Sequence, residues 1–297
     1  RREVRLGAPS TTTTGRGRSK AATAAAIAAA AAAASAGGDV GEEGAGGGGG
    51  GAGGAPPPVA TGPGAKRFVF DGVFGPAAGQ AEVYEAVVSP IVEEVLAGYN
   101  CTVFAYGATS SGKTHTIHGD VPSVAAGACG GGGPGAGLIP RSVAHIFGAL
   151  RADAAAAAAE WSVRVSHLEL YNEQIADLLA VDGGGDALRI YDDAAKGTTV
   201  AGLTEVAVAS EGELLALLAA SAARRRTAAT AMNARSSRSH SVLTITTHVR
   251  SAGAGGEDLL KVGKLNLVDL AGSENVGRSG AVAARAREAG AINQSLL

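Results

Sequence analysis

Apolar and polar residues alternate with two different periods along the chain, and these periods predict strands and helices. Residues 161–171 (WSVRVSHLELY) alternate apolar and polar side chains, as a half-buried strand does. Residues 81–99 place them at helical spacing, and Pro90 predicts a kink or break there because proline removes one helical hydrogen bond. Further strands are predicted at residues 67–70, 101–106, 239–249 and 259–270, and further helices at 140–152 and 211–223. This alternation predicts an α/β domain with a mostly parallel or mixed sheet.

The first 66 residues carry little of this pattern. Residues 21–34 are almost pure alanine, and residues 37–64 are mostly glycine with a run of three prolines. A short alanine helix has no apolar stripe to dock, and a Gly/Pro tract cannot repay its ordering entropy. We therefore expect residues 1–66 to be an N-terminal remnant with a disordered insertion. The alanine run also lacks the length and hydrophobicity of a membrane span, and no leucine-rich core predicts a signal peptide.

Charge and cysteine content narrow the function classes. The formal net charge is −2, from 25 basic and 27 acidic side chains, so no global basic excess indicates a nucleic-acid partner. The two cysteines are Cys101, in a predicted buried strand, and Cys129, in a glycine-rich loop. This pair argues against a disulfide framework and for a reducing, cytosolic compartment.

Residues 107–114 (GATSSGKT) follow the predicted strand 101–106 and precede a short predicted helix that starts near Lys113 and stops near Gly119. The spacing G-x-x-x-x-G-K-[ST] lets successive backbone N–H groups face phosphates. Lys113 is expected to reach the β- and γ-phosphates, and the Thr114 hydroxyl to ligate Mg²⁺. A helix that starts at Lys113 would add the positive end of its dipole.

Two later segments support a nucleotide site. Residues 265–274 (LNLVDLAGSE) form a predicted strand that ends at Asp269, where a phosphate-loop enzyme places the carboxylate that holds Mg²⁺ through water. Gly272 could bring its N–H close to a γ-phosphate, since glycine permits a close backbone approach. Residues 233–240 (NARSSRSH) offer hydroxyls for the phosphate, the metal or the attacking water, and Arg238 to pair with Glu274. Alone, this segment would indicate a polar turn capped by serines.

In this order and spacing, GATSSGKTHT, NARSSRSH and DLAGSE resemble the phosphate loop, switch I and switch II of the kinesin motor domain. Supporting matches are FVFDGVFG, GYNCTVFAYG, GLIPRSVAHIF and HLELYNEQIADLL, so the resemblance covers about residues 67–297. TAATAMN and the stretch 263–297 look most like the bipolar mitotic spindle kinesins, whereas Ser110 and His115 are closer to conventional kinesins. The expected fold is a P-loop NTPase of kinesin type, with a central mixed β-sheet flanked by helices.

The resemblance implies a site for ATP and Mg²⁺. The implied catalytic residues are Lys113, Ser236, Ser237, Arg238, Gly272 and Glu274, the last at the end of a water-mediated proton relay. The implied metal ligands are Thr114 and Ser237, with Asp269 acting through water. The implied nucleotide-binding residues are Gly107, Ala108, Thr109, Ser110, Ser111, Gly112, Lys113, Thr114, His115 and Asn233. His115 would lie against the adenine, or is instead an ordinary, partly exposed helix residue.

The implied partner is the microtubule, whose acidic surface makes Arg278, Arg285 and Arg287 candidate contacts, the alternative being a solvated basic loop. Neither a nucleic acid nor a membrane is an expected partner. The implied location is the cytoplasmic cytoskeleton and spindle, and a coiled coil outside this sequence would make the longer protein oligomeric.

The chain also departs from the family pattern. We find no Arg-x-Arg-Pro segment to pack on adenine, and the opening RREVRL resembles a strand further into the domain, so we expect both ends of the domain to be missing. Ala108 replaces a usual glutamine. The predicted loop 121–137 matches the drug-binding loop of bipolar kinesins but lacks its tryptophan, so inhibitors of that site are expected to bind poorly.

Two further readings compete with an ATP-driven microtubule motor. One is an inactive microtubule-binding or structural fragment that keeps the motifs, as the missing adenine strand suggests. The other, a small GTPase, is disfavoured because the sequence has no Asn-Lys-x-Asp segment to read guanine.

Overall fold

The computed structural model of the chain describes residues 2–7, 24–28, 65–120, 133–157, 160–180, 188–193, 197–230, 237–252 and 258–274. These residues belong to two compact units. The first includes an antiparallel pair of strands, β1 (Arg2–Gly7) and β3 (Ala65–Phe70). The opening segment is therefore a strand, as its sequence suggested. The second unit spans residues 21–31 and 78–297 and carries the central sheet. The predicted domain boundary after residue 66 stays a prediction.

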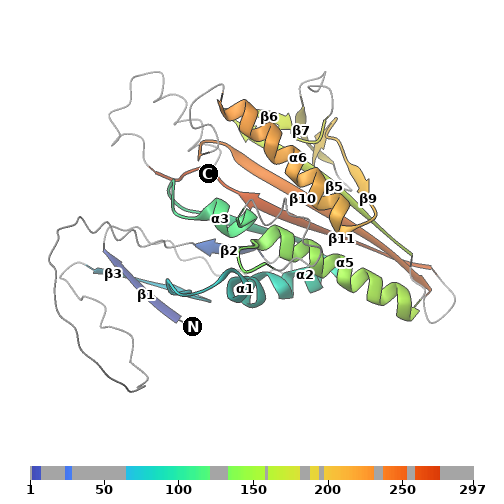
Figure 1. Cartoon of the computed structure of the whole chain (residues 1–297), viewed down its shortest axis with the longest axis horizontal. Helices are drawn as coiled ribbons and strands as arrows, with labels where there is room; N and C mark the ends of the chain where they lie inside the picture. Colours follow the sequence, from blue (N-terminus) through green and yellow to red (C-terminus); the bar gives the residue numbers. More distant parts are fainter. Residues whose placement is uncertain are drawn as a thin grey trace, which may run out of the picture. The chain divides into compact units, whose positions relative to one another are not determined.

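The central sheet is mixed, as predicted, and has the strand order β2-β4-β11-β10-β5-β6, with β9 also paired to β5 (Figure 1). Strands β2 and β11 run parallel to β4, and the other pairs are antiparallel. The strands are β2 (Ala24–Ala28), β4 (Asn100–Tyr106), β5 (Glu160–Tyr171), β6 (Gln174–Asp177), β9 (Val206–Val208), β10 (His240–Ala252) and β11 (Asp258–Asp269). A separate antiparallel hairpin pairs β7 (Arg189–Asp193) with β8 (Gly197–Ala201).

Strand β2 differs from the prediction of a flexible segment for the alanine run. Ala24–Ala28 pairs in parallel with the edge of β4. Pairing at a sheet edge uses backbone N–H and C=O groups, which alanine supplies as well as any other residue. Side-chain pattern therefore could not reveal this strand.

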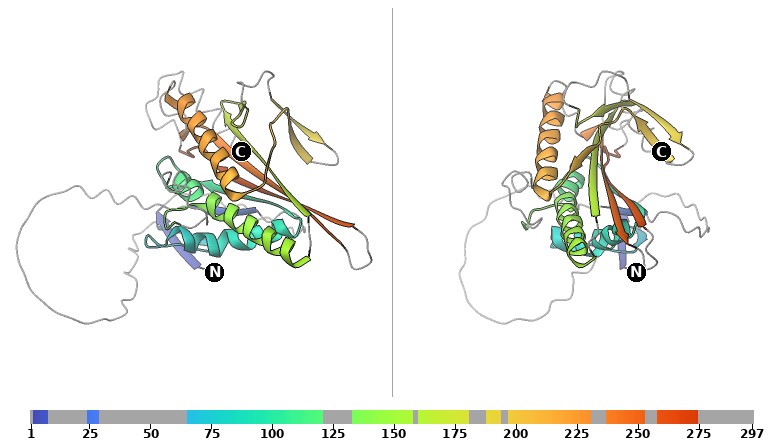
Figure 2. Two further views of the ribbon diagram at one scale, coloured as in Figure 1. Left: turned by 45° about the vertical axis from the view of Figure 1, so that its right-hand side comes forward. Right: turned by 90° about the vertical axis from the view of Figure 1, so that its right-hand side faces the viewer.

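Among the described residues, α2, α3, α5 and α6 each contact a strand of the central sheet, and α2, α3 and α6 each also contact α5 (Figure 2). The helices are α1 (Gln80–Val83), α2 (Ser89–Leu96), α3 (Lys113–His118), α5 (Leu138–Ala157) and α6 (Glu211–Thr230). Val143, Ile146, Phe147 and Leu150 of α5 are buried, and so are Ile91, Val92 and Val95 of α2. Both α5 and α6 extend beyond their predicted ends, α5 through a run of alanines, the strongest helix formers. Among the described residues, no helix combines the length and apolar character that a membrane crossing requires.

Pro90 distorts its helix without ending it. The π-helical turn η1 (Tyr84–Val88) lies between α1 and α2, and the Ser89 N–H donates to the Tyr84 carbonyl five residues earlier. A proline has no N–H to donate and its ring crowds the carbonyl four residues before it, which a wider turn accommodates. In place of the predicted kink or break, the structure has a π turn, and the helix continues through Pro90.

Candidate functional site

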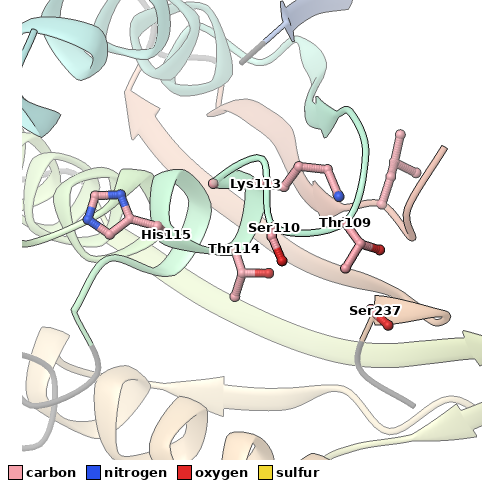
Figure 3. A pocket seen from close by; sticks show the side chains of 8 residues that line it. Thr109, Ser110, Lys113, Thr114, His115 and Ser237 are labelled. Atoms are coloured by element: carbon pink, nitrogen blue, oxygen red, sulfur yellow. The ribbon is translucent and has the colours of Figure 1, made fainter. Parts of the chain in front are cut away.

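A pocket lies where β4 gives way to α3. Ser110 has φ 64° and Gly112 has φ 94°, so the loop reverses through left-handed positions before the first residue of α3. Alternation of this kind turns backbone N–H groups toward one concave point. The pocket holds about 270 Å³ and is lined by Thr109, Ser110, Gly112, Lys113, Thr114, His115, Ser237 and Leu270 (Figure 3).

Lys113 carries its charge into this pocket. Its side chain is nearly buried, with 8% exposed, and its ammonium donates to the carbonyl oxygens of Gly107 and Ala108, both at 2.9 Å. The two carbonyls hold the ammonium at the base of the loop. A third N–H of the ammonium is left to donate to a phosphate oxygen.

The predicted metal-binding residues Thr114 and Asp269 meet in the structure. The Thr114 hydroxyl donates to Oδ2 of Asp269 at 2.7 Å, although the two residues are 155 positions apart. They meet because β11 runs parallel to β4, with Asp269 in register with Ala105, so both strands end at the same edge. Oδ1 of Asp269 is buried and has no hydrogen-bond partner among the described residues. A hydroxyl beside an unpartnered carboxylate oxygen is a donor set that suits Mg²⁺ and its water ligands.

A buried ion-pair network behind Asp269 was not predicted. Nη1 of Arg225, in α6, lies 3.7 Å from Oδ2 of Asp269, and its Nε donates to Oε1 of Glu169 at 3.3 Å. Glu169 is 1% exposed and also accepts from the Ser239 hydroxyl at 2.6 Å. The only sequence signals were an arginine run at residues 224–226 and a charge within an apolar strand. Arg225 fell outside the predicted helix, which ended at residue 223.

Buried histidines surround the same carboxylate. Burial lowers the pKa of His118 and of His240, and the negative charge of Asp269 partly opposes both shifts. Nδ1 of His240 accepts the N–H of Ala271 at 3.2 Å, so this ring holds the segment after β11. Neutral imidazoles at these positions leave Arg225 as the positive neighbour of Asp269.

The segments before β10 and after β11 are tied together. The Gly272 N–H donates to the Ser237 carbonyl at 2.9 Å, and the Ser273 N–H to the Gly107 carbonyl at 3.1 Å. The Gly272 N–H is thus engaged by Ser237 in this structure, and its contact with a γ-phosphate stays a prediction. A side chain at Gly272 would displace the Glu274 carboxylate and Oγ1 of Thr109, which are in contact with each other here.

Glu274 is held by the phosphate loop. Its carboxylate accepts from the Thr109 N–H at 2.9 Å and from the Thr109 hydroxyl at 2.5 Å. Burial alone would raise the pKa of Glu274, but these hydrogen bonds and the charge of Lys113 bring it below its ordinary value. The Thr109 contact was not predicted, because its partners lie 165 residues apart. Pairing of Glu274 with Arg238 stays a prediction.

His115 lines the pocket with 61% of its side chain exposed. It is thus partly exposed and also placed to touch a ligand, and contact with adenine stays a prediction. The buried side chain of Gln80 contacts it, which the sequence did not suggest. The loop residues Ala108 and Ser111 lie beside the pocket, joined by a backbone bond of 3.2 Å. The predicted site residues Asn233 and Ser236, the arginines at 278, 285 and 287, Cys129 and most of the loop 121–137 lie outside the described residues.

Comparison with known proteins gives a consistent family match. The family model of the kinesin motor domain matches residues 59–297. The chain is 52% identical over 237 residues to the kinesin-like protein KIF11-B of Xenopus laevis, which covers 79% of this chain and 22% of that protein. It is 50% identical over 239 residues to the kinesin-like protein KIN-5C of Arabidopsis thaliana, covering 77% and 23%. It is 49% identical over 235 residues to the kinesin-like protein Klp61F of Drosophila melanogaster, covering 78% and 22%.

A solved structure shows the same fold. A fast kinesin, reported with implications for its ATPase mechanism and its interactions with microtubules, superimposes with a TM-score of 0.66 at 40% sequence identity. The match covers 76% of this chain and 60% of the solved chain. The chain therefore spans less than a quarter of the curated relatives and part of the solved domain.

Proposed function

Because the chain belongs to the kinesin motor domain family, and is about half identical to KIF11, KIN-5 and Klp61F proteins, we propose that it is an ATP-hydrolysing microtubule motor of the spindle. The observation that carries the proposal is the hydrogen bond between Thr114 and the buried Asp269, close to the Lys113 ammonium that two loop carbonyls hold in place. These three groups supply a phosphate charge partner and a metal site at one strand edge. Phosphoryl transfer needs little more than such positioning and charge stabilisation.

The proposed mechanism gives each residue one task. Lys113 neutralises charge on the β- and γ-phosphates. Thr114, Ser237 and Asp269 would hold Mg²⁺, which when bound would supply positive charge to offset the negative charge on the phosphates. Ser236 and Gly272 orient the attacking water and the γ-phosphate, and Asn233 completes the nucleotide contacts.

Switching would require two contacts beside the pocket to change. The Gly272 N–H must leave the Ser237 carbonyl before it can donate to a γ-phosphate. Glu274 must likewise exchange Thr109 for Arg238 before it can accept a proton from the attacking water through the relay. If a bound γ-phosphate stabilises both new contacts, it would order the two segments. Loss of the phosphate would then release them. The segment after residue 274 would carry that change to the microtubule, with Arg278, Arg285 and Arg287 facing its acidic surface.

The same proposal sets the cellular context. The partner is the microtubule, with neither nucleic acid nor membrane, and the location is the cytoplasmic cytoskeleton and spindle. The longer protein would oligomerise through a coiled coil. A non-hydrolysing, microtubule-binding protein is the second candidate.

Microtubule-stimulated ATPase activity separates the two candidates. We would compare the 297-residue chain with one extended at both ends, each with its Lys113→Ala variant. A motor predicts stimulation by microtubules in at least the extended chain, lost in the variant. Microtubule binding without hydrolysis in both chains would support the second candidate and contradict the motor.

A further inference from the structure

Gln80, the first residue of α1, directs both hydrogens of its side-chain amide at one distant residue. Its Nε2 lies 3.1 Å from Nδ1 of His115 and donates to the carbonyl oxygen of His115 at 2.6 Å. Gln80 is only 9% exposed, and it lies 35 positions from His115 along the chain. A buried amide with both hydrogens engaged is a rigid support.

This support fixes the orientation of the imidazole. An amide nitrogen only donates, so Nδ1 of His115 accepts, and the proton of the neutral ring is on Nε2. Nε2 lies 3.7 Å from Oδ1 of Asp120, so both ring nitrogens have defined neighbours. Despite these contacts 61% of the side chain remains exposed. The ring is therefore held at Nδ1 by Gln80 and still open to a ligand.

The supported ring stands at one end of the pocket. Figure 3 shows His115 on the far side of Thr114 from Lys113 and Thr109. Phosphates belong at the Lys113 end, since that end has the ammonium and the convergent N–H groups. Whatever is attached to the phosphates and extends past Thr114 therefore meets the imidazole, whose flat face suits stacking on a nucleobase.

We propose that Gln80 is a positioning residue for the nucleoside part of the bound nucleotide and acts through the ring of His115. This inference rests on the proposed nucleotide site and adds a residue to it. Without Gln80, the imidazole loses its fixed orientation and an ordering cost is added to nucleotide binding.

Binding of Mg·ATP and of Mg·tripolyphosphate to the 297-residue chain tests this. Tripolyphosphate keeps the phosphates and lacks the nucleoside. For Gln80→Met we expect the Kd for ATP to rise roughly three- to tenfold, the effect of one hydrogen bond, with the Kd for tripolyphosphate unchanged. In a His115→Phe background, where the ring no longer needs Nδ1 support, Gln80→Met should change the Kd for ATP less than twofold.

Other outcomes contradict the inference. If Gln80→Met raises the Kd for ATP and the Kd for tripolyphosphate equally, Gln80 acts on the phosphate loop through the His115 carbonyl and the inference fails. If it has the same effect in both backgrounds, the ring is not the route. Should Gln80→Met fail to fold, the second variant is His115→Ala, which leaves the Gln80 bond to the carbonyl in place. This variant must weaken the binding of ATP and leave the binding of tripolyphosphate unchanged. A wild-type chain that binds neither ligand contradicts the proposed function itself.

Discussion

At the scale of a single residue, Thr109 sets the acidity of Glu274. Thr109→Val keeps the backbone N–H bond and removes the hydroxyl donor, so the pKa of Glu274 should rise toward its ordinary value of 4.5. Because the folded-state pKa is depressed, the stabilisation exists above pH 4.5 and is lost as pH falls through the lower folded value. Carbon-13 titration of the Glu274 carboxylate measures the change.

Thr198→Val is the matched control for that variant. It removes a similar hydroxyl bond, from Thr198 to Oδ1 of Asp192 at 2.8 Å, on the separate β7–β8 hairpin. We expect it to leave the titration of Glu274 unchanged. If the pKa of Glu274 shifts equally in both variants, or does not shift in Thr109→Val, the Thr109 hydroxyl does not lower the pKa of this carboxylate.

His167 should make the fold sensitive to mild acid. The Ser221 hydroxyl donates to the Leu218 carbonyl, so it accepts from Nδ1–H of His167, while Nε2 accepts from the Ser241 hydroxyl. Burial, with smaller effects of His118 and Arg225, lowers the pKa of His167 to about 3. The unfolded chain therefore binds a proton near pH 6.5 that the folded chain refuses, and stability falls as pH drops below 6.5.

The measurement is the free energy of unfolding between pH 5 and pH 7.5. His167→Gln should reduce the slope below pH 6.5 by about one proton, or ~1.4 kcal/mol per pH unit. This slope is independent of any overall loss of stability from the two serine contacts. A slope equal to that of the wild type would mean that His167 does not stay neutral in the fold.

At the scale of elements, α2 packs directly on the backbone of β11. A side chain at Gly263 would collide with the Val95 carbonyl, and both partners are backbone, so neither can turn away. We expect Gly263→Ala to destabilise the fold by about 2–3 kcal/mol, as overpacking does. Gly148→Ala is the control, since Gly148 lies in α5 with nothing near its missing Cβ, and it should stabilise by about 0.5–1 kcal/mol. Denaturant unfolding of both variants tests the contact, and equal effects would contradict it.

Segments that are contiguous in sequence could be predicted, and contacts between distant elements could not. The phosphate loop was predictable because its function depends on one contiguous segment with fixed spacing. Asp269 was predictable because it ends an apolar strand. Three side-chain contacts could not be predicted from the sequence: Gln80 with His115, Thr109 with Glu274, and Arg225 with Glu169. Each contact joins elements that are distant in sequence, and no periodicity encodes which distant polar residues meet. Strand β2 escaped prediction for the related reason that backbone groups decide its pairing.

At the scale of the whole molecule, the proposed nucleotide should protect one unit and leave the other unaffected. Every pocket residue belongs to the second unit, whereas β1 and β3 pair with each other in the first. A ligand that binds only the folded state stabilises it by about 2.7 kcal/mol at a hundredfold excess over its Kd. We therefore expect Mg·ATP to slow hydrogen exchange in β4, α3 and the end of β11, with exchange in β1 and β3 unchanged. Lys113→Ala should abolish this protection, because the ammonium is the charge that the phosphates meet. Protection of β1 and β3 as well would mean that nucleotide binding couples the two units, and protection that survives in Lys113→Ala would place the ligand elsewhere.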